Sequence, residues 1–442
     1  MKDFLVRGFV CAVIPFALLL TVGAASDRNP HSLPPSPISF GQSSDLLTQL
    51  AELSASDGTR KNQLGLSVAI SGNTVVVGAP GANDGHKQGA GAIYVFTKPT
   101  NGWGNMTQTA KLTCANGTTS IACGSSVAIS GNTIVTNGGD PVLVQNVLLV
   151  FAEPTDGWRN MTQTAELTVT DQGSFDGGFN AVAISGNTIV AGTELSSVFG
   201  TQEGEAYVYV EPANGWVNMT QTAILSPSDG GSSYHFGSAV AFTGNEAVIG
   251  ADDANNDIGG AYVFVEPAGG WVNMTQTAKL TASDGIPVDF FGFSVAISGS
   301  TVVVGAPYED IGSHSEQGGT YVFVEPTTGW QDMTETAKLT TSTGGTGNLF
   351  GYSVSASGNS VLIGAPNVRI GSNTAEGAAY IFQQPPTGWV TTAQPAAKFS
   401  AGTQGSNFGA SVVLEAATAV AGAPTGVTGG TKSTGKAYVF GP

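Results

Sequence analysis

Charged residues are scarce in this chain, and their scarcity excludes whole classes of fold. They make up 11% of the 442 residues, where a soluble domain has about 25%. Because helix surfaces are usually covered by Lys, Glu and Arg, this composition argues against helical bundles and coiled coils. In their place stand 62 glycines, with Ser, Thr and Asn at turn-like intervals between runs of Val, Ile and Ala. That pattern is typical of many short strands and predicts an all-β protein.

Basic residues are the scarcer of the two charged classes. Lys and Arg number 15 against 32 Asp and Glu, which gives a formal net charge of -17, and no basic cluster occurs. Binding to nucleic acid needs a positively charged face, so we exclude nucleic acid as a partner and disfavour anionic membrane surfaces. Cations and neutral ligands such as sugars suit this charge better.

A long hydrophobic run occurs only near the N-terminus. Lys2 and Arg7 precede an apolar run over 9–22, and small residues follow it. This order predicts that residues 1–25 are a secretory signal peptide and that the mature protein is extracellular, with a retained anchor as the alternative. Residues 26–44 contain four prolines and are predicted to be a linker. No later segment resembles a membrane span, so we expect a soluble, secreted protein.

Cysteine is rare as well. Cys11 lies in the predicted signal peptide, and Cys114 and Cys123 lie nine residues apart inside one loop. In an oxidising compartment, an isolated pair at this distance predicts a disulfide. A metal-binding pair is the alternative, but a structural zinc site needs four ligands and the four histidines are scattered.

The strongest signal is an internal repeat. A phrase that reads Ser-Val-Ala-Ile-Ser-Gly-Asn in its best copies aligns seven times, with its valine at Val68, Val127, Val182, Val240, Val295, Val354 and Val412. All the tryptophans follow in register, at Trp103, Trp158, Trp216, Trp271, Trp330 and Trp389. The first copy predicts strands over 67–71 and 74–79 joined by a Gly-Asn turn, a third strand over 92–97 and a fourth over 109–113.

A long period with four strands and no helix is typical of a β-propeller blade, so seven copies predict a seven-bladed propeller over residues 45–442. The seventh copy stops after its third strand, at 437–440, whereas Leu46–Leu53 matches the fourth strand of the other copies. We therefore expect this N-terminal strand to complete the last blade, which would remove two exposed sheet edges. We also expect the protein to be a monomer.

These repeats resemble a known family. Phe291-Gly292 followed by Gly305-Ala306-Pro307 resembles the FG-GAP repeat, the blade motif of the integrin α-chain head. The same spacing joins Gly351 to Gly364-Ala365-Pro366, Gly409 to Gly422-Ala423-Pro424, and Gly65 to Gly78-Ala79-Pro80. The stretches Ala278–Gly285 and Gly260–Phe264 are more similar still to secreted FG-GAP repeat proteins of unassigned activity. The resemblance implies a propeller over about 45–442.

Copies two, three and four depart from the motif. In copy three, Phe179 stands where we expect the second motif residue, Gly, and copy four ends in Asp252 after Gly250-Ala251. These departures affect the edges of the motif and leave the strand pattern intact. We therefore expect seven blades in spite of them.

The family resemblance also raises the question of calcium. Integrin-type blades place an Asp-rich calcium loop between the first and second strands, but here a two-residue turn without a carboxylate occupies that connection. No family calcium site can therefore be carried over. The nearest substitute lies in another loop, where Asp253, Asn255 and Asp257 alternate as possible oxygen donors. A solvated turn is the alternative, and calcium is the one cofactor that the sequence leaves open.

Propeller topology predicts which loops share a face. Loops between second and third strands, and connections between blades, open on one face, which should be acidic and suit cations, cation-bridged ligands or basic segments of a partner. The other face should carry five glycosylation sequons, at Asn105, Asn116, Asn160, Asn218 and Asn273. In copy five, Asp332 stands in the sequon position, so the motif could also belong to the repeat itself.

The sequence predicts binding and gives no catalytic residues. The tryptophans stand at a fixed place in every repeat, which favours packing between blades over stacking on sugars. We therefore expect a secreted, non-catalytic binding or adhesion module whose acidic loop face contacts an extracellular protein or glycan. A lectin-like propeller with sugar pockets between blades is one alternative. A secreted polysaccharide hydrolase or lyase is another, for which Glu309 and Asp310 would be the carboxylates.

Overall fold

The computed structural model describes residues 47–59, 61–84, 88–114, 123–140, 145–170, 178–194, 203–231, 234–401, 404–425, 427–428, 431–432 and 434–442. The predicted signal peptide and linker lie outside these residues and stay predictions.

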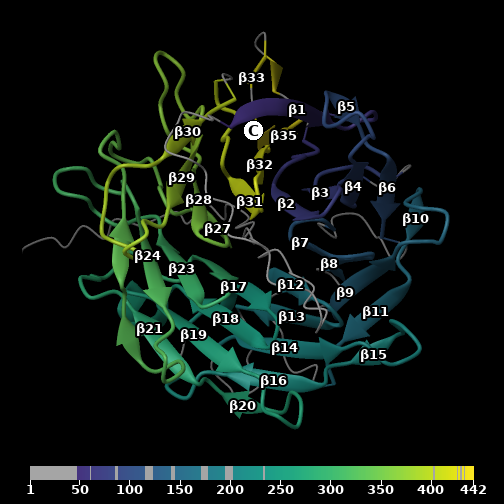
Figure 1. Ribbon diagram of the computed structural model, residues 1–442. Coiled ribbons are helices and arrows are strands. Elements are labelled where there is room, and N and C mark those ends of the chain that lie inside the picture. Colours follow the sequence, from purple (N-terminus) through teal and green to yellow (C-terminus); the bar gives the residue numbers. More distant parts are fainter. Residues whose placement is uncertain are drawn as a thin grey trace, which may run out of the picture.

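Seven sheets stand around a central axis as the blades of a propeller (Figure 1). We number the blades 1 to 7 in chain order of their innermost strands. Each innermost strand contacts the next, and that of blade 7 contacts that of blade 1. The prediction of seven mainly antiparallel blades is therefore confirmed.

Within each blade, four strands run outward from the axis. The innermost strands are β2 (Ser67–Ser71), β7 (Val127–Ser130), β12 (Ala181–Ser185), β17 (Phe236–Thr243), β22 (Ser294–Ser298), β27 (Ser353–Ser357) and β31 (Ser411–Glu415). The second strands are β3 (Thr74–Ala79), β8 (Thr133–Asp140), β13 (Thr188–Thr193), β18 (Glu246–Ala251), β23 (Thr301–Ala306), β28 (Ser360–Ala365) and β32 (Thr418–Ala423). The third strands are β4 (Ala92–Thr97), β9 (Gln145–Ala152), β14 (Glu205–Val210), β19 (Gly260–Val265), β24 (Gly319–Val324), β29 (Ala378–Gln383) and β35 (Lys436–Gly441).

The outer strands complete each blade. Those of blades 1 to 6 are β6 (Ala110–Thr113), β11 (Ala165–Thr168), β16 (Ala223–Ser226), β21 (Ala278–Thr281), β26 (Ala337–Leu339) and β30 (Ala397–Phe399). Blade 7 takes its outer strand from the other end of the chain: β1 (Thr48–Ser54) pairs antiparallel with β35, with Leu53 opposite Ala437. Ala51 and Leu53 are fully buried there. The predicted closure is confirmed.

Five blades carry a fifth strand that four-stranded blades did not lead us to expect. It is a Met-Thr pair from the tryptophan loop of the following blade, and it runs parallel to the outer strand. These strands are β5 (Met106–Thr107), β10 (Met161–Thr162), β15 (Met219–Thr220), β20 (Met274–Thr275) and β25 (Met333–Thr334). Figure 1 shows β5, β10, β15 and β20 on the outer rim, where each pairs with the outer strand of the preceding blade.

The hydrophobic core is divided into layers between blades. Seven clusters of buried residues occur, and each joins side chains of two neighbouring blades. Trp271, for example, packs with residues of blades 3 and 4 and is 5% exposed. Five of the six tryptophans are buried and Trp103 is partly buried, which confirms that they pack between blades and leaves the five buried rings unsuitable for stacking on a sugar.

The glycines of the repeated motif lie where two blades touch. A Cβ atom on Gly305 in blade 5 would lie 2.0 Å from the backbone oxygen of Gly351 in blade 6, and one on Gly364 would lie 2.0 Å from that of Gly409 in blade 7. No side chain fits such an approach. The motif glycine of one blade therefore docks directly on that of the next.

Copy three follows this motif differently from our prediction. The N–H of Asn180 donates to the oxygen of Gly192 at 3.0 Å, the bond that motif glycines make in other blades. Phe179 packs edge-on against Tyr207 with ring centroids 5.9 Å apart, as the motif phenylalanines do. Asn180, not Phe179, therefore replaces the glycine. The sequence prediction located the glycine position by counting back from Val182. This copy has one residue fewer between the motif and that valine, so the count reached Phe179 in place of Asn180.

The remaining elements are short. They are the helix α1 (Ala254–Asp257) and the two-stranded sheet of β33 (Val427–Thr428) and β34 (Thr431–Lys432). Within the part of the chain that is described, no helix has the length and apolar character to cross a membrane.

Candidate functional site

The acidic loops gather on one face of the propeller, as strand direction requires. The second strand of a blade ends where its third begins and where the next blade is entered, so these loops share an end of the ring. The described acidic residues in them are Asp57, Asp84, Glu194, Glu203, Asp229, Asp252, Asp253, Asp257, Asp284, Asp289, Glu309, Asp310, Glu316 and Glu376. Asp140, the last residue of β8, lies at the same end. Asp171 and Asp176 lie outside the described residues. We call this end the acidic face.

A cleft of about 400 Å³ opens on the acidic face at blade 5. Four chain segments form it. They are the connection from β21 to β22, the loop from β23 to β24, the outer strand β26 with the residue Thr340 that follows it, and Thr391 of blade 6. They bring together the carboxylates of Asp284, Asp289, Glu309 and Asp310 with a single ammonium group, that of Lys338. Negative charge therefore predominates in the cleft.

A repeated polar cluster forms the floor of this cleft. Nζ of Lys338 donates to Oδ2 of Asp284 at 2.6 Å, and the hydroxyl of Tyr321 donates to Oδ1 of the same carboxylate at 2.9 Å. The ammonium group also lies 5.0 Å from the centre of the Tyr321 ring. We call this arrangement the Asp-Tyr-Lys latch, because its Asp follows the outer strand of one blade and its Tyr and Lys belong to the next.

Blade 1 has the same latch but no carboxylate at the position of Glu309. Nζ of Lys111 donates to Oδ2 of Asp57 at 2.6 Å, and Tyr94 donates to Oδ1 at 2.8 Å. Counting from the motif, Ala82 of blade 1 stands at the position that Glu309 has in blade 5. The latch is therefore part of the propeller frame, and Glu309 is an addition to it.

Glu309 is buried and incompletely paired. It is 5% exposed, its Oε1 accepts from Lys338, and its Oε2 accepts no hydrogen bond. Burial raises the pKa of Glu309 to about 7, although the nearby ammonium group of Lys338 opposes this shift. Room for the carboxylate comes from Gly319, where a Cβ atom would lie 2.0 Å from Oε2.

Two other carboxylates of the cleft hold its loops. Oδ2 of Asp289 accepts from the N–H of Ile286 at 2.8 Å, and Oδ1 of Asp310 accepts from the N–H of Glu316 at 2.9 Å. Asp289 is buried, and burial raises its pKa. Both side chains thus shape the walls within which Glu309 and Lys338 lie.

The predicted calcium residues lie in a different loop of the acidic face. Oδ2 of Asp253 is 3.0 Å from Nδ1 of His235, which the sequence analysis did not select. Asp257 ends α1, and its backbone oxygen accepts from the N–H of Val288 at 3.0 Å. The side chain of Asn255 lies outside the described residues. Calcium at these three residues stays a prediction.

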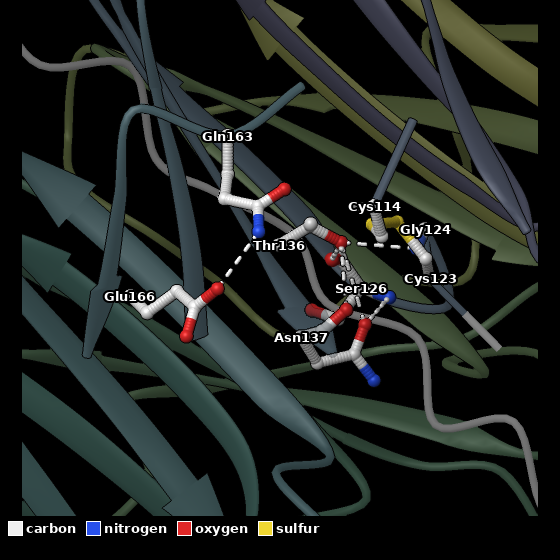
Figure 2. The surroundings of a disulfide bond; sticks show 8 residues. All are labelled: Cys114, Cys123, Gly124, Ser126, Thr136, Asn137, Gln163 and Glu166. Atoms are coloured by element: carbon white, nitrogen blue, oxygen red, sulfur yellow. Dashed lines mark hydrogen bonds between the residues drawn. A yellow bond between two sulfur atoms is a disulfide. The ribbon is translucent and has the colours of Figure 1, made fainter. Parts of the chain in front are cut away.

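The predicted disulfide between Cys114 and Cys123 is present. Figure 2 shows it beside the polar network that replaces the motif in copy two, where Oγ1 of Thr136 accepts from the N–H of Gly124 at 3.0 Å and donates to the oxygen of Ser126 at 2.8 Å. These bonds connect β7 and β8 where other copies use the glycine motif. The disulfide ties the entry of blade 2 to the outer strand of blade 1.

The described sequon asparagines lie on the rim, and each has a structural contact. Oδ1 of Asn273 accepts from the N–H of Ile224 in the preceding blade at 2.9 Å. Asn105, Asn160 and Asn218 make the corresponding bond to Glu52, Lys111 and Glu166. In blade 5, Asp332 does the same for Lys279 at 2.7 Å. This rim clasp explains why the motif repeats, and glycosylation stays a prediction; Asn116 lies outside the described residues.

Comparison with known proteins gives a family. The model of the FG-GAP repeat matches residues 47–96, 219–264, 274–323 and 333–382. Each match starts at the rim or outer strand of one blade and ends in the third strand of the next, so the family unit spans two blades. No curated protein matches the chain. The fold is of a type used for binding, and the chain is an FG-GAP repeat protein built as a seven-bladed β-propeller.

Proposed function

We propose that the protein is a secreted, non-catalytic binding module that holds a Lys or Arg side chain of a partner protein in the cleft of blade 5. The observation that carries this proposal is Glu309, a residue that lines an acidic cleft and whose buried Oε2 accepts no hydrogen bond. An incoming cation would supply the missing partner. Buried carboxylates are normally paired, so pairing at this atom would stabilise a complex.

The other contacts of the cleft support a cationic ligand. Asp289 and Asp310 accept hydrogen bonds from backbone N–H groups and so order the loops that form the cleft. Ile286 and Ile311 also line the cleft and offer apolar contact to the methylene groups of a long basic side chain. With four carboxylates and one ammonium group, the cleft attracts cations from a distance.

The test uses the full chain and short peptides. Alanine-based peptides with one central Arg or Lys are titrated into the protein and compared with a peptide that carries neutral citrulline in place of Arg. We expect the basic peptides to bind, with affinity falling as salt is added. Glu309→Gln should weaken binding about tenfold or more.

The matched control for this test is Asp156→Asn. Asp156 is an exposed carboxylate that pairs with Arg159 in the tryptophan loop of blade 2, away from the acidic face. We expect this variant to bind as the unaltered protein does. Equal binding of the citrulline peptide, or equal binding by Glu309→Gln, would contradict the proposal.

Hydrolysis of a polysaccharide is the second candidate function. One observation favours it: the raised pKa of Glu309, about 7, would let the carboxyl group act as a general acid near neutral pH. Against it, Lys338 holds one oxygen of Glu309, and Asp310 is bonded to the loop. Release of reducing sugar ends, lost in Glu309→Gln and in Asp310→Asn, would favour the enzyme over the binding module.

Secretion, the monomeric state and the lectin alternative each have a test of their own. Sequencing the N-terminus of exported protein would test removal of residues 1–25, and sedimentation would test for a monomer. A glycan array, read with and without calcium, would test for sugar binding between blades. Multivalent sugar binding that Glu309→Gln leaves unchanged would favour the lectin.

A further inference from the structure

Blades 3 and 4 bring a histidine and two aspartates together on the acidic face. The register of β17 and β18 places Phe236 opposite Ala251. His235, just before the first strand, and Asp252, just after the second, therefore meet at the end of the hairpin. Asp253 follows directly.

The distances are those of a potential metal site. Nδ1 of His235 is 3.0 Å from Oδ2 of Asp253 and 3.7 Å from Oδ1 of Asp252. One possible ligand atom from each of the three residues lies within 4.8 Å of the others. A metal ion at the centre of such a group would contact all three after small side-chain movements.

Asp252 supplies a second, independent observation. It is 7% exposed, and its Oδ1, which faces His235, accepts no hydrogen bond. Leaving a carboxylate oxygen buried without a partner is costly. A bound cation would satisfy this atom.

Comparison with other blades shows that these residue types are special to blade 4. In blade 5 the same three positions hold Phe290, Pro307 and Tyr308, and the two aromatic rings pack at 5.2 Å between centroids. In blade 7, Asn407 stands at the first position and Thr425 at the third, and Asn407 accepts a hydrogen bond from Thr425. The loop frame is common to the blades, but only blade 4 among these three places metal-binding side chains in it.

We propose that His235, Asp252 and Asp253 bind a zinc ion. An imidazole nitrogen with carboxylate oxygens suits zinc and related transition metals, whereas calcium takes oxygen ligands alone. Three protein ligands leave a fourth position for water or for a group of a partner molecule. This site is separate from the cleft of blade 5, and it shares only Asp253 with the predicted calcium loop.

The experiment uses the full chain after treatment with a chelator. Zinc chloride and calcium chloride are titrated separately by calorimetry, and the melting temperature is measured with each metal. We expect one zinc ion to bind per chain and to raise the melting temperature, because a ligand of the native state stabilises it. Calcium should do neither. Cobalt in place of zinc should give the visible absorption of a bound ion.

Two variants and one control make the site falsifiable. His235→Ala and Asp253→Asn should lose the zinc heat and the metal-dependent rise in melting temperature, with metal-free folding checked by circular dichroism. His314→Ala removes an exposed histidine of the blade 5 loop and should bind zinc normally. Absence of zinc binding, zinc binding that survives in both site variants, or loss of it in His314→Ala would overturn the proposal. Calcium binding that persists in His235→Ala would also overturn the zinc proposal, and it would favour the predicted calcium loop of Asp253, Asn255 and Asp257.

Discussion

Blades 1 and 5 share one frame and differ in the side chains beside it. In both, a lysine of the outer strand joins an aspartate of the preceding blade beneath a tyrosine ring. Blade 1 has Ala82 beside this latch, and blade 5 has Glu309. The latch alone holds two blades together, whereas the latch with an extra buried carboxylate also creates a site. The same frame can therefore carry different side chains at the positions beside the latch.

The largest effect should come from building the blade 5 arrangement in blade 1. Ala82→Glu places a carboxylate in a fully buried position against the methyl group of Ala92, and we expect a loss of about 4 kcal/mol in the free energy of unfolding. Adding Ala92→Gly, which copies Gly319, should restore about 1 kcal/mol or more. Urea denaturation of the two variants measures both. Equal stability of the single and double variants would show that Gly319 is not what makes room.

Removing the lysine should separate the two latches. Lys338→Met leaves Glu309 buried without a cation, and we expect it to cost about 3 kcal/mol at neutral pH. Lys111→Met, the matched change in blade 1, leaves no buried carboxylate behind: it removes the partner of the half-exposed Asp57 and a donor to the backbone oxygen of Asn83, and it should cost about 1 kcal/mol. Thermal and urea unfolding of both variants give the comparison. If the two losses are equal, Glu309 adds nothing to the latch.

The pH dependence should isolate Glu309 itself. Its pKa in the folded protein is about 7, against an ordinary value of 4.5, so the folded state holds the proton more tightly. Its contribution to stability is fully present below about pH 4.5 and is lost as the pH rises through 7. Relative to Glu309→Gln, the unaltered protein should therefore lose about 3 kcal/mol over this range. A difference between the two proteins that does not change with pH would contradict the raised pKa.

The smallest effect concerns the rim clasp, which blades 1 to 5 share. Asn273→Ala removes the acceptor for the N–H of Ile224 and should cost about 1 kcal/mol in protein made without glycosylation. Thr275→Ala destroys the same sequon but keeps this acceptor, and it should cost less. Asp332→Asn should be nearly neutral, since the oxygen is retained. Equal losses in the Asn273 and Thr275 variants would argue against the clasp.

The sequence was sufficient to predict the frame, because the frame is repeated. Seven registered valines, six tryptophans and an unmatched N-terminal strand define the blades and the closure, and Leu53 lies where the repeat places it. The rim strands were missed because two residues carry no periodicity. Copy three was misread at Phe179 because one missing residue shifts the register without changing the pattern.

The candidate sites were harder to predict because they depend on neighbours distant in the sequence. Glu309 was noticed as half of an adjacent carboxylate pair, but its significance lies in Lys338 and in the space left by Gly319. Asp253 was assigned to a loop of alternating oxygen donors, while its contact in the structure is His235. A histidine directly before the Phe-Gly motif was a usable signal. Aligning the residue before each motif would have identified it as the odd member.

The closure of blade 7 has a consequence for synthesis of the protein. The strand β1 is translated long before its partner β35, which holds residues 436–441. Until β35 has left the ribosome, the buried side chains of β1 have no strand to pack against and the ring cannot close. Before then, a nascent chain can pair its β1 with blade 7 of a neighbouring chain on the same polysome. We therefore expect domain-swapped dimers as the characteristic by-product of rapid overexpression.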